Sequence, residues 1–321
     1  MDTGADRHVL KLTPALWHAA RRWYLRQVTS DECVTISEYN HAVQQVLAQP
    51  WPTWIEAGSA ALGIARDTFP SPQQVGLFAL ETTDLVSVVV PVFNEESTIL
   101  DVLQRLANVP AVAQIIVVDD ASRDHTGERL AAVREQLTQE FWTKRLPGGL
   151  LILAHAVNQG KGAALRTGFP HATQAWTGVQ DADTEYDPND LMRLLTLAKS
   201  QGANVAYGSR FLLSEGGTSP LWHREGNRLI TLLANWSFGL RLSDVETCYK
   251  LVESSRLKKV TGQLRENRFG IEIELTARLA QTPEVRFVEC PITYDRRTYA
   301  EGKKIGMRDA FQAVWCMFKY R

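Results

Sequence analysis

The sequence predicts an α/β protein with a mostly parallel, doubly wound sheet. From residue 85 onward, short apolar runs rich in β-branched residues alternate with longer segments in which apolar residues recur at helical spacing. This alternation is typical of a parallel sheet with helices on both faces. The 321 residues, 45% of them hydrophobic, are enough to bury such a core and indicate one large domain or two smaller ones.

The expected elements follow one another in a regular order. Strands are predicted at residues 85–90, 114–118, 150–153, 177–180 and 204–207. Helices are predicted between them, at about residues 99–106, 126–137, 162–173 and 189–201. Because ligands of doubly wound sheets bind at the carboxyl ends of the strands, the polar residues that follow each strand are the candidates for a site.

Residues 1–80 are expected to form a helical N-terminal extension, with the α/β domain spanning residues 81–321. Thr13 before a proline is a typical helix start, and Thr35–Glu38 fits a capping box. A third helix is predicted over Thr53–Arg66. The extension contains no motif that indicates a chemical function.

Charge and composition exclude several classes of function. The 35 basic and 36 acidic side chains nearly balance, so no overall positive field would attract nucleic acid. The four cysteines form no C-x-x-C pair, which indicates free thiols in a reducing compartment. No secretory signal is found, and the longest apolar runs are about half the ~20 residues that a membrane span needs. A cytoplasmic protein without a transmembrane segment is therefore expected.

The most specific chemical signal is the acidic cluster Asp181-Ala182-Asp183-Thr184-Glu185, after the fourth predicted strand. In an extended segment alternate side chains face the same way, so the three carboxylates can address one ligand or ion. Hard divalent cations prefer carboxylate oxygens, and Mg²⁺ keeps positions for phosphate oxygens. The cluster therefore indicates a metal site, although such a pattern taken alone is more often an acidic surface turn.

Two other strand ends allow more than one interpretation. Gly160-Lys161-Gly162 fails the dinucleotide pattern G-x-G-x-x-G, because Leu165 stands at the third glycine position. This segment is either a flexible helix start or a loop that contacts a nucleotide. Asp119 and Asp120 either cap the helix that follows them or accept hydrogen bonds from a base or ribose.

Taken together, these motifs resemble those of the family 2 glycosyltransferases, and within them the dolichyl-phosphate mannose and glucose synthase branch, also called polyprenyl-phosphate glycosyltransferases. The likeness covers roughly residues 84–316. It is carried, in chain order, by residues 90–95, 117–122, 158–162, 180–185, 207–211, 226–228, 244–250, 266–270 and 297–304. The resemblance implies the GT-A nucleotide-diphospho-sugar transferase fold, which is Rossmann-like. The N-terminal extension is not part of the family pattern.

The resemblance also implies roles for individual residues. The donor nucleotide would be held by Pro91, Phe93, Glu95, Val118, Asp120, Asp181 and Ala182. Asp183 and Glu185 would hold Mg²⁺ or Mn²⁺ at the diphosphate. The diphosphate itself would be bound by Arg210, Arg297 and Lys303, and the acceptor phosphate by Arg228 and Lys250. Cations at these places suit the negative charge that accumulates on a leaving diphosphate.

Asp244 and Arg210 are the expected catalytic residues. Asp244 occupies the place where many sugar transferases of this fold keep a general base. A phosphate acceptor, with a second pKa of about 6, is already largely anionic at neutral pH and needs orientation rather than deprotonation. In that case Asp244 only positions Lys250 or Arg228, and a structural capping role is the remaining alternative.

The expected function is a metal-dependent, inverting transfer of a hexose from a nucleotide diphosphate sugar to a polyprenyl phosphate. UDP-glucose or a related sugar is the favoured donor. One alternative is transfer to a soluble saccharide or small molecule, which the lack of a membrane anchor favours. The other is a non-catalytic protein that binds nucleotide sugars.

Two apolar segments each allow two interpretations. Residues 307–320 carry an aromatic stripe that includes Trp315 and Phe318, and residues 229–236 carry Leu229, Leu232 and Trp236. Each segment either packs onto the catalytic domain or faces lipid, the first on an anionic bilayer surface and the second as a groove for an acceptor lipid. Peripheral contact with the inner face of a membrane is therefore a further expectation. Nothing in the sequence indicates an oligomeric state.

Overall fold

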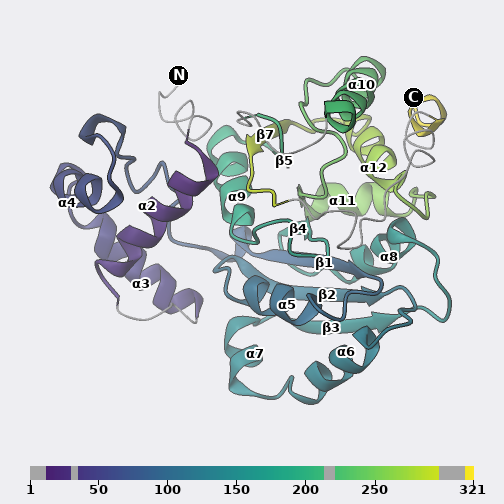
Figure 1. The fold of residues 1–321 in the computed structure, drawn as a ribbon, viewed down its shortest axis with the longest axis horizontal. Coiled ribbons are helices and arrows are strands. Elements are labelled where there is room, and N and C mark those ends of the chain that lie inside the picture. The colour runs from purple at the N-terminus through teal and green to yellow at the C-terminus, as the bar shows by residue number, and fades with distance from the viewer. Residues whose placement is uncertain (1–11, 30–34, 213–220, 296–314) are drawn as a thin grey trace.

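The structure is a computed structural model that describes residues 12–29, 35–212, 221–295 and 315–321 (Figure 1). Within these residues one sheet of seven strands runs in the order β3-β2-β1-β4-β6-β5-β7. Its strands are β1 (Val86–Val92), β2 (Val112–Asp119), β3 (Gly149–Ala154), β4 (Trp176–Val179), β5 (Val205–Ser209), β6 (Lys250–Glu253) and β7 (Phe287–Pro291). All neighbours are parallel except β6, which is antiparallel to β4 and β5. The mostly parallel sheet is thus confirmed.

The centre of the sheet is apolar on both faces. Every residue of β1 and β2 is buried, whereas the edge strand β3 is only partly buried. Unbroken burial explains why β1 and β2 appear in the sequence as continuous β-branched runs rather than as alternating patterns. Burial of these strands supplies the main hydrophobic stabilisation of the α/β domain.

Helices cover both faces of the sheet (Figure 1). They are α5 (Ile99–Ala107), α6 (Thr126–Glu135), α7 (Glu140–Arg145), α8 (Lys161–Gly168), α9 (Asp190–Gln201), α10 (Leu221–Phe238), α11 (Ser254–Thr261) and α12 (Ile271–Ala280). The helix predicted over residues 162–173 is shorter than expected: it ends at Gly168 and continues as a 3₁₀ turn, Phe169–His171. Pro170 within that turn has no N–H for an α-helical bond, which explains the early end.

The extension consists of α2 (Pro14–Arg26), α3 (Ile36–Leu47) and α4 (Pro52–Leu62), at the left of Figure 1. The Thr13 cap and the Thr35–Glu38 capping box are both present. The helix predicted over Thr53–Arg66 instead ends before Gly63, whose φ of 64° is a left-handed C-terminal cap.

The extension packs against α9 of the α/β domain. His18 Nε2 lies 3.0 Å from Asp190 Oδ1, and both side chains are buried. Next to it, the main chain at Gly76 is so close to Thr196 that a Cβ atom on Gly76 would lie 2.3 Å from the Thr196 hydroxyl oxygen. The extension therefore shares a continuous core with the sheet.

The three cysteines within the described part of the chain, Cys248, Cys290 and Cys316, are buried free thiols. In the same residues, no helix combines the length and the apolar character needed to cross a bilayer.

Candidate active site

The strand order predicts a ligand-binding crevice between the carboxyl ends of β1 and β4. Strand β1 pairs with β2 on one side and with β4 on the other. The connection after β1 therefore leads toward the β3 edge of the sheet, whereas the connection after β4 leads toward the β7 edge. Thr98 joins the two strand ends, because its hydroxyl lies 3.0 Å from Glu95 Oε2 and 2.9 Å from the carbonyl oxygen of Ala182. Two predicted donor-binding residues are thereby brought together.

The loops after β1 and β2 hold each other in unusual backbone conformations. Asn94 (φ 55°) and Ala121 (φ 59°) both lie in the left-handed region, which is uncommon for residues other than glycine. The Asn94 N–H donates to Ser122 Oγ (3.0 Å), and the Arg123 N–H donates back to Asn94 Oδ1 (2.8 Å). Asp119 accepts two bonds from Ser122, so its carboxylate stabilises this turn.

Asp120 is buried, and its carboxylate is surrounded by donors of the loop that precedes α8. It accepts bonds from the N–H groups of Gln159 (2.9 Å) and Gly160 (2.6 Å), and it lies 2.7 Å from His155 Nδ1. In this structure Asp120 therefore fixes the loop 155–160. A contact with the nucleoside remains a prediction.

Pro91, Val118 and Ala182 are buried at or near the carboxyl ends of β1, β2 and β4, and their contact with the nucleotide remains a prediction. Phe93 and Glu95 are partly exposed at the end of β1, as a contact with a ligand requires.

The glycines of the Gly160-Lys161-Gly162 segment allow close packing of two loops. A Cβ atom on Gly160 would lie 2.5 Å from the Asn267 carbonyl oxygen, and one on Gly162 would lie 2.3 Å from that of Glu266. Gly160 also has a φ of 101°, a conformation in which an L side chain is strained. Neither of the two interpretations drawn from the sequence included this contact.

We call the acidic cluster after β4, residues 181–185, the acidic strand end. Lys161 connects it to the interior of the protein. Its ammonium group lies 2.7 Å from Asp181 Oδ1 and 2.9 Å from Glu272 Oε1. Burial alone would lower the pKa of Lys161, but these carboxylates raise it well above its usual value. A permanent positive charge therefore lies beside Asp181.

Lys250 lies on the other side of Glu272 from Lys161. Its ammonium group pairs with Glu272 and donates to the Thr247 carbonyl oxygen, and the side chain is fully buried. Lys250 therefore supports the site from inside in this structure, and direct contact with an acceptor phosphate remains a prediction.

Arg210 and Asp244 form a bidentate pair. Arg210 Nε lies 2.6 Å from Asp244 Oδ2, Arg210 Nη2 lies 2.8 Å from Oδ1, and Asn227 Nδ2 adds a bond of 3.1 Å to Oδ1. Burial by itself would raise the pKa of Asp244, but the Arg210 guanidinium holds it below its usual value. A buried carboxylate of low pKa is a weak proton acceptor, so the geometry favours positioning over general-base catalysis. Its partners are Arg210 and Asn227, not Lys250 or Arg228 as the sequence led us to expect.

Tyr294 links this pair to the acidic strand end. The Arg210 guanidinium lies 5.3 Å from the centre of the Tyr294 ring, and the Tyr294 hydroxyl donates to Glu185 Oε2 at 2.7 Å. Burial, and to a smaller extent Glu185, raise the pKa of Tyr294, so the phenol stays protonated. No pattern in the sequence points to this tyrosine, because it follows β7, far along the chain from Glu185.

Asp183 and Glu185 are chemically suited to a divalent cation. Both are partly exposed at the end of β4, and the Glu185 N–H donates to Asp183 Oδ1 at 3.2 Å, which keeps the two residues adjacent. Among the described residues, no group of three or more His, Cys, Asp or Glu side chains is arranged to hold a metal ion. Two carboxylates with a diphosphate and water as the other ligands would fit Mg²⁺.

The other basic residues predicted to bind phosphate, apart from Arg210 and Lys250, lie away from these contacts or outside the described residues. Arg228 is exposed on α10, one residue after Asn227. Arg297 and Lys303 lie outside the described residues.

A further carboxyl group lies among the charges of the site. Burial, opposed by Arg210, raises the pKa of Glu246 to about 7. Its electrostatic partners also include Asp244, Lys250 and Glu272. We call Arg210, Asp244, Glu246, Lys250 and Glu272 the buried charge cluster; Asp244, Lys250 and Glu272 are buried, and Arg210 and Glu246 are partly buried. Glu246 lies within the motif at residues 244–250, but the sequence of this motif does not show that the Glu246 carboxyl group is desolvated.

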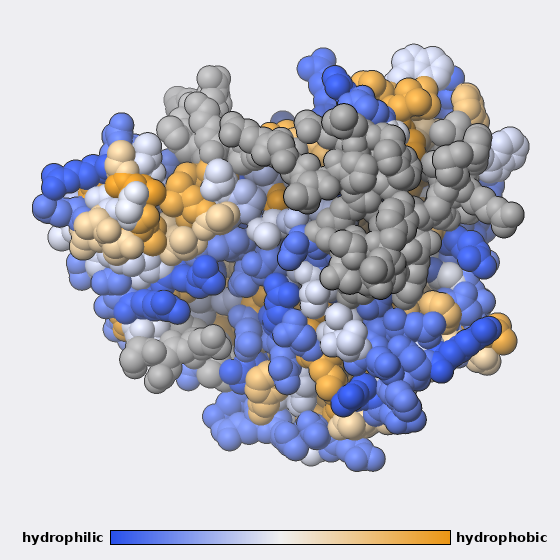
Figure 2. Space-filling view, in the orientation of Figure 1, coloured by the Kyte–Doolittle hydropathy of each residue, from blue (hydrophilic) through white to orange (hydrophobic). Residues whose placement is uncertain are grey.

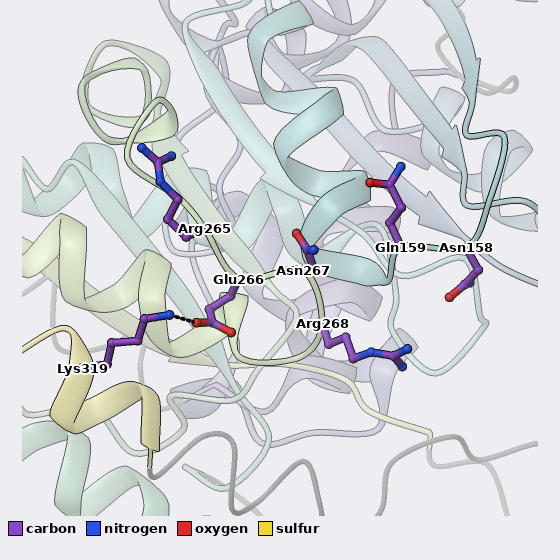
Figure 3. A pocket seen from close by; sticks show the side chains of 7 residues that line it. All are labelled: Asn158, Gln159, Arg265, Glu266, Asn267, Arg268 and Lys319. Carbon is purple, nitrogen blue, oxygen red and sulfur yellow. Dashed lines mark hydrogen bonds and ion pairs between the residues drawn. The ribbon is translucent and has the colours of Figure 1, made fainter.

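A cavity of about 540 Å³ opens behind the glycine segment (Figure 3). Asn158 and Gln159 line one side, while Arg265, Glu266 and Lys319 line the other. An ion pair of 2.7 Å joins Lys319 to Glu266 across that second side. Among the described residues, none of the predicted site residues lines this cavity, so the candidate active site remains the carboxyl ends of the strands.

The sequence is similar to those of known glycosyltransferases. Residues 87–260 match the family model described as glycosyl transferase family 2. The chain is 28% identical over 243 residues to the undecaprenyl-phosphate 4-deoxy-4-formamido-L-arabinose transferase of Pseudomonas paraeruginosa, covering 73% of this chain and 65% of that protein. It is 26% identical to the undecaprenyl-phosphate mannosyltransferase of Micrococcus luteus, covering 69% of this chain and 88% of that protein.

The solved structures show the fold. Glucosyl-3-phosphoglycerate synthase from Mycobacterium tuberculosis, in complex with Mn²⁺ and uridine diphosphate, superposes with a TM-score of 0.52 at 18% identity. The match covers 74% of this chain and 80% of that one. The predicted GT-A fold is thus confirmed. With the family model spanning more than half of its length, the chain belongs to glycosyl transferase family 2 and is a glycosyltransferase.

Proposed function

We propose that this glycosyltransferase moves a hexose, with inversion, from a nucleotide diphosphate sugar to a polyprenyl phosphate. The observation that carries the proposal is that Tyr294 contacts both Arg210 and Glu185, and that Glu185 is hydrogen-bonded to Asp183. Carboxylates for a metal and a guanidinium for phosphate are what a leaving diphosphate requires.

The donor would lie along the crevice between β1 and β4. Phe93 and Glu95 would contact the nucleoside, with Asp120 holding the adjoining loop. The diphosphate would lie toward Asp181, Asp183 and Glu185. A Mg²⁺ or Mn²⁺ ion bound by Asp183 and Glu185 would neutralise the charge that develops on the diphosphate.

The acceptor phosphate would approach from the side of Arg228, which is exposed on α10. One of its oxygens would attack the anomeric carbon opposite the departing diphosphate, so that one C–O bond forms as the other breaks. The phosphate is already anionic near neutral pH, so no base is needed. The low pKa of Asp244 fits this reaction, because an ionised Asp244 can orient Arg210 but cannot readily accept a proton.

The names of the relatives support the acceptor class, because those proteins act on undecaprenyl phosphate. UDP-glucose is the favoured donor, and transfer to a soluble saccharide is the competing possibility.

One experiment tests both substrates. The purified protein is incubated with Mn²⁺, radiolabelled UDP-glucose or GDP-mannose, and either undecaprenyl phosphate in detergent or a mixture of soluble sugars. Label in the organic phase is the expected result. Label only in soluble sugars would show that the acceptor is a soluble sugar and not undecaprenyl phosphate. Binding of nucleotide sugars without transfer from any donor would contradict the proposed activity.

A further inference from the structure

Helix α10 exposes large apolar side chains on its outer face. Leu229, Leu232 and Trp236 are 59%, 57% and 65% exposed, and their spacing of three and four residues places them on one side of the helix. The opposite side, with Ile230 and Ala234, is buried. A helix that is apolar on both sides is typical of one that is covered on both sides.

The last residues of the chain extend this surface. Trp315 and Phe318 are 66% and 63% exposed, while Cys316 and Met317 between them are buried. The guanidinium of Arg321 lies 4.4 Å from the centre of the Trp236 ring, which places the C-terminus beside α10. We call Leu229, Leu232, Trp236, Trp315 and Phe318 the apolar face.

Figure 2 shows hydrophobic side chains gathered at the edge of the molecule where Figure 1 places α10 and the C-terminus, with hydrophilic ones beside them. Exposed apolar patches of this kind mark interaction surfaces.

The charges around the apolar face are mainly positive. Arg228 and Arg321 lie next to it, and Lys319 is exposed beside Phe318, although it also pairs with Glu266. Glu225 is the one acidic residue of α10. Tryptophan and leucine bordered by arginine and lysine are the composition of helices that lie on anionic membranes.

We propose that the apolar face docks on the surface of an anionic lipid bilayer. The inference deepens the proposed function and rests on it, since a polyprenyl phosphate lies in a membrane. The inner side of the same helix reaches the site, because Asn227 donates to Asp244. Docking would therefore place Arg228 at the level of the lipid phosphates, next to the buried charge cluster.

Vesicle sedimentation without donor or polyprenyl phosphate tests the docking by itself. Vesicles of phosphatidylglycerol and phosphatidylcholine are compared with vesicles of phosphatidylcholine alone, at low and high salt. The full-length protein is expected to sediment with the anionic vesicles, and high salt should weaken this binding several-fold. The double variant Leu232→Glu, Trp236→Glu should lower the vesicle partition coefficient at least ~10-fold.

Val157→Glu is the matched control, because Val157 is 65% exposed but lies outside the apolar face. Unchanged melting temperatures show that the variants fold. Binding that is equal in wild type and double variant, or absent in wild type, would overturn the proposal. So would self-association that the double variant abolishes while no vesicle binds. Because donor turnover plays no part in this assay, its failure leaves the proposed reaction to be judged separately.

Discussion

At the ends of β1 and β4 the acidic side chains are partly exposed and are held in place by neighbouring loops, whereas around Arg210 the charged side chains are buried and hold one another. Glu185, for example, accepts from Tyr294 at the surface of the crevice, while Asp244 is enclosed by Arg210 and Asn227. The first arrangement leaves carboxylates accessible to a ligand. The second fixes one guanidinium in a single orientation. Substitutions in the two regions should therefore have different consequences for activity and for folding.

The largest expected effect is on catalysis at the acidic strand end. Asp183→Ala should lower donor turnover by ~10³-fold or more, because the metal loses one of its two carboxylates. Its melting temperature should change little, since Asp183 is partly exposed. Turnover and the stabilisation by UDP with Mn²⁺ are measured on the same preparation. Thr184→Ala, at the exposed neighbouring position, is the control; turnover of Asp183→Ala within ~10-fold of wild type would remove the metal assignment.

Arg210→Ala should affect both activity and stability, which distinguishes the buried charge cluster from the acidic strand end. It leaves the carboxylate of Asp244 buried without its partner, at an expected cost of roughly 3–5 kcal/mol in the free energy of unfolding. Turnover should fall ~10²-fold or more. Chemical denaturation and kinetics give the two values. If the double variant Arg210→Ala, Asp244→Ala is no more stable than Arg210→Ala, the pair is not what makes the substitution costly.

Tyr294→Phe tests the connection between the two regions. Loss of the hydroxyl removes the bond to Glu185, and a weakening of Mn²⁺ affinity by ~10-fold is expected from the loss of a group that orients a metal ligand. The ring contact with Arg210 is kept. Titration of Mn²⁺ in the presence of UDP gives the affinity. An unchanged affinity would separate the two regions functionally.

The smallest expected effect is on the pH dependence of stability. The folded-state pKa of Glu246 is about 7, above its ordinary value of 4.5, so the folded protein keeps a proton that the unfolded chain has released. The stability from this group is fully present below about pH 4.5 and is lost as the pH rises through about 7. Glu246→Gln should therefore gain roughly 1–3 kcal/mol relative to wild type between pH 5 and pH 8. Denaturation curves at both pH values measure the gain, and parallel pH profiles would contradict the desolvation of Glu246.

Much of the fold could be predicted because the buried strands β1 and β2 are continuous apolar runs. The acidic strand end could be predicted equally well, since all its carboxylates lie within five consecutive residues. Strands β6 and β7 were not expected: β6 has only four residues and begins with a lysine, so its strand character depends on pairing with β4 and β5.

The buried charge cluster could be predicted only in part. Arg210 and Asp244 were singled out, but their bond joins residues 34 positions apart, and no local pattern specifies it. Lys250 was assigned to the acceptor phosphate by its position in the family pattern, which does not show whether the side chain is exposed. Its partner Glu272 comes from α12, so its burial became evident only from the packing of that helix.

The order of the strands has a consequence for how the protein folds during synthesis. β1 to β4 are consecutive in the chain and are neighbours in the sheet, so this half of the sheet can assemble once residue 179 has left the ribosome. β6, which separates β4 from β5, is made about seventy residues later. The helices of the extension emerge first, but the α9 residues that bind them, including Asp190, come after β4. We therefore expect the crevice for the donor to form early, and the extension to close onto the domain only after it.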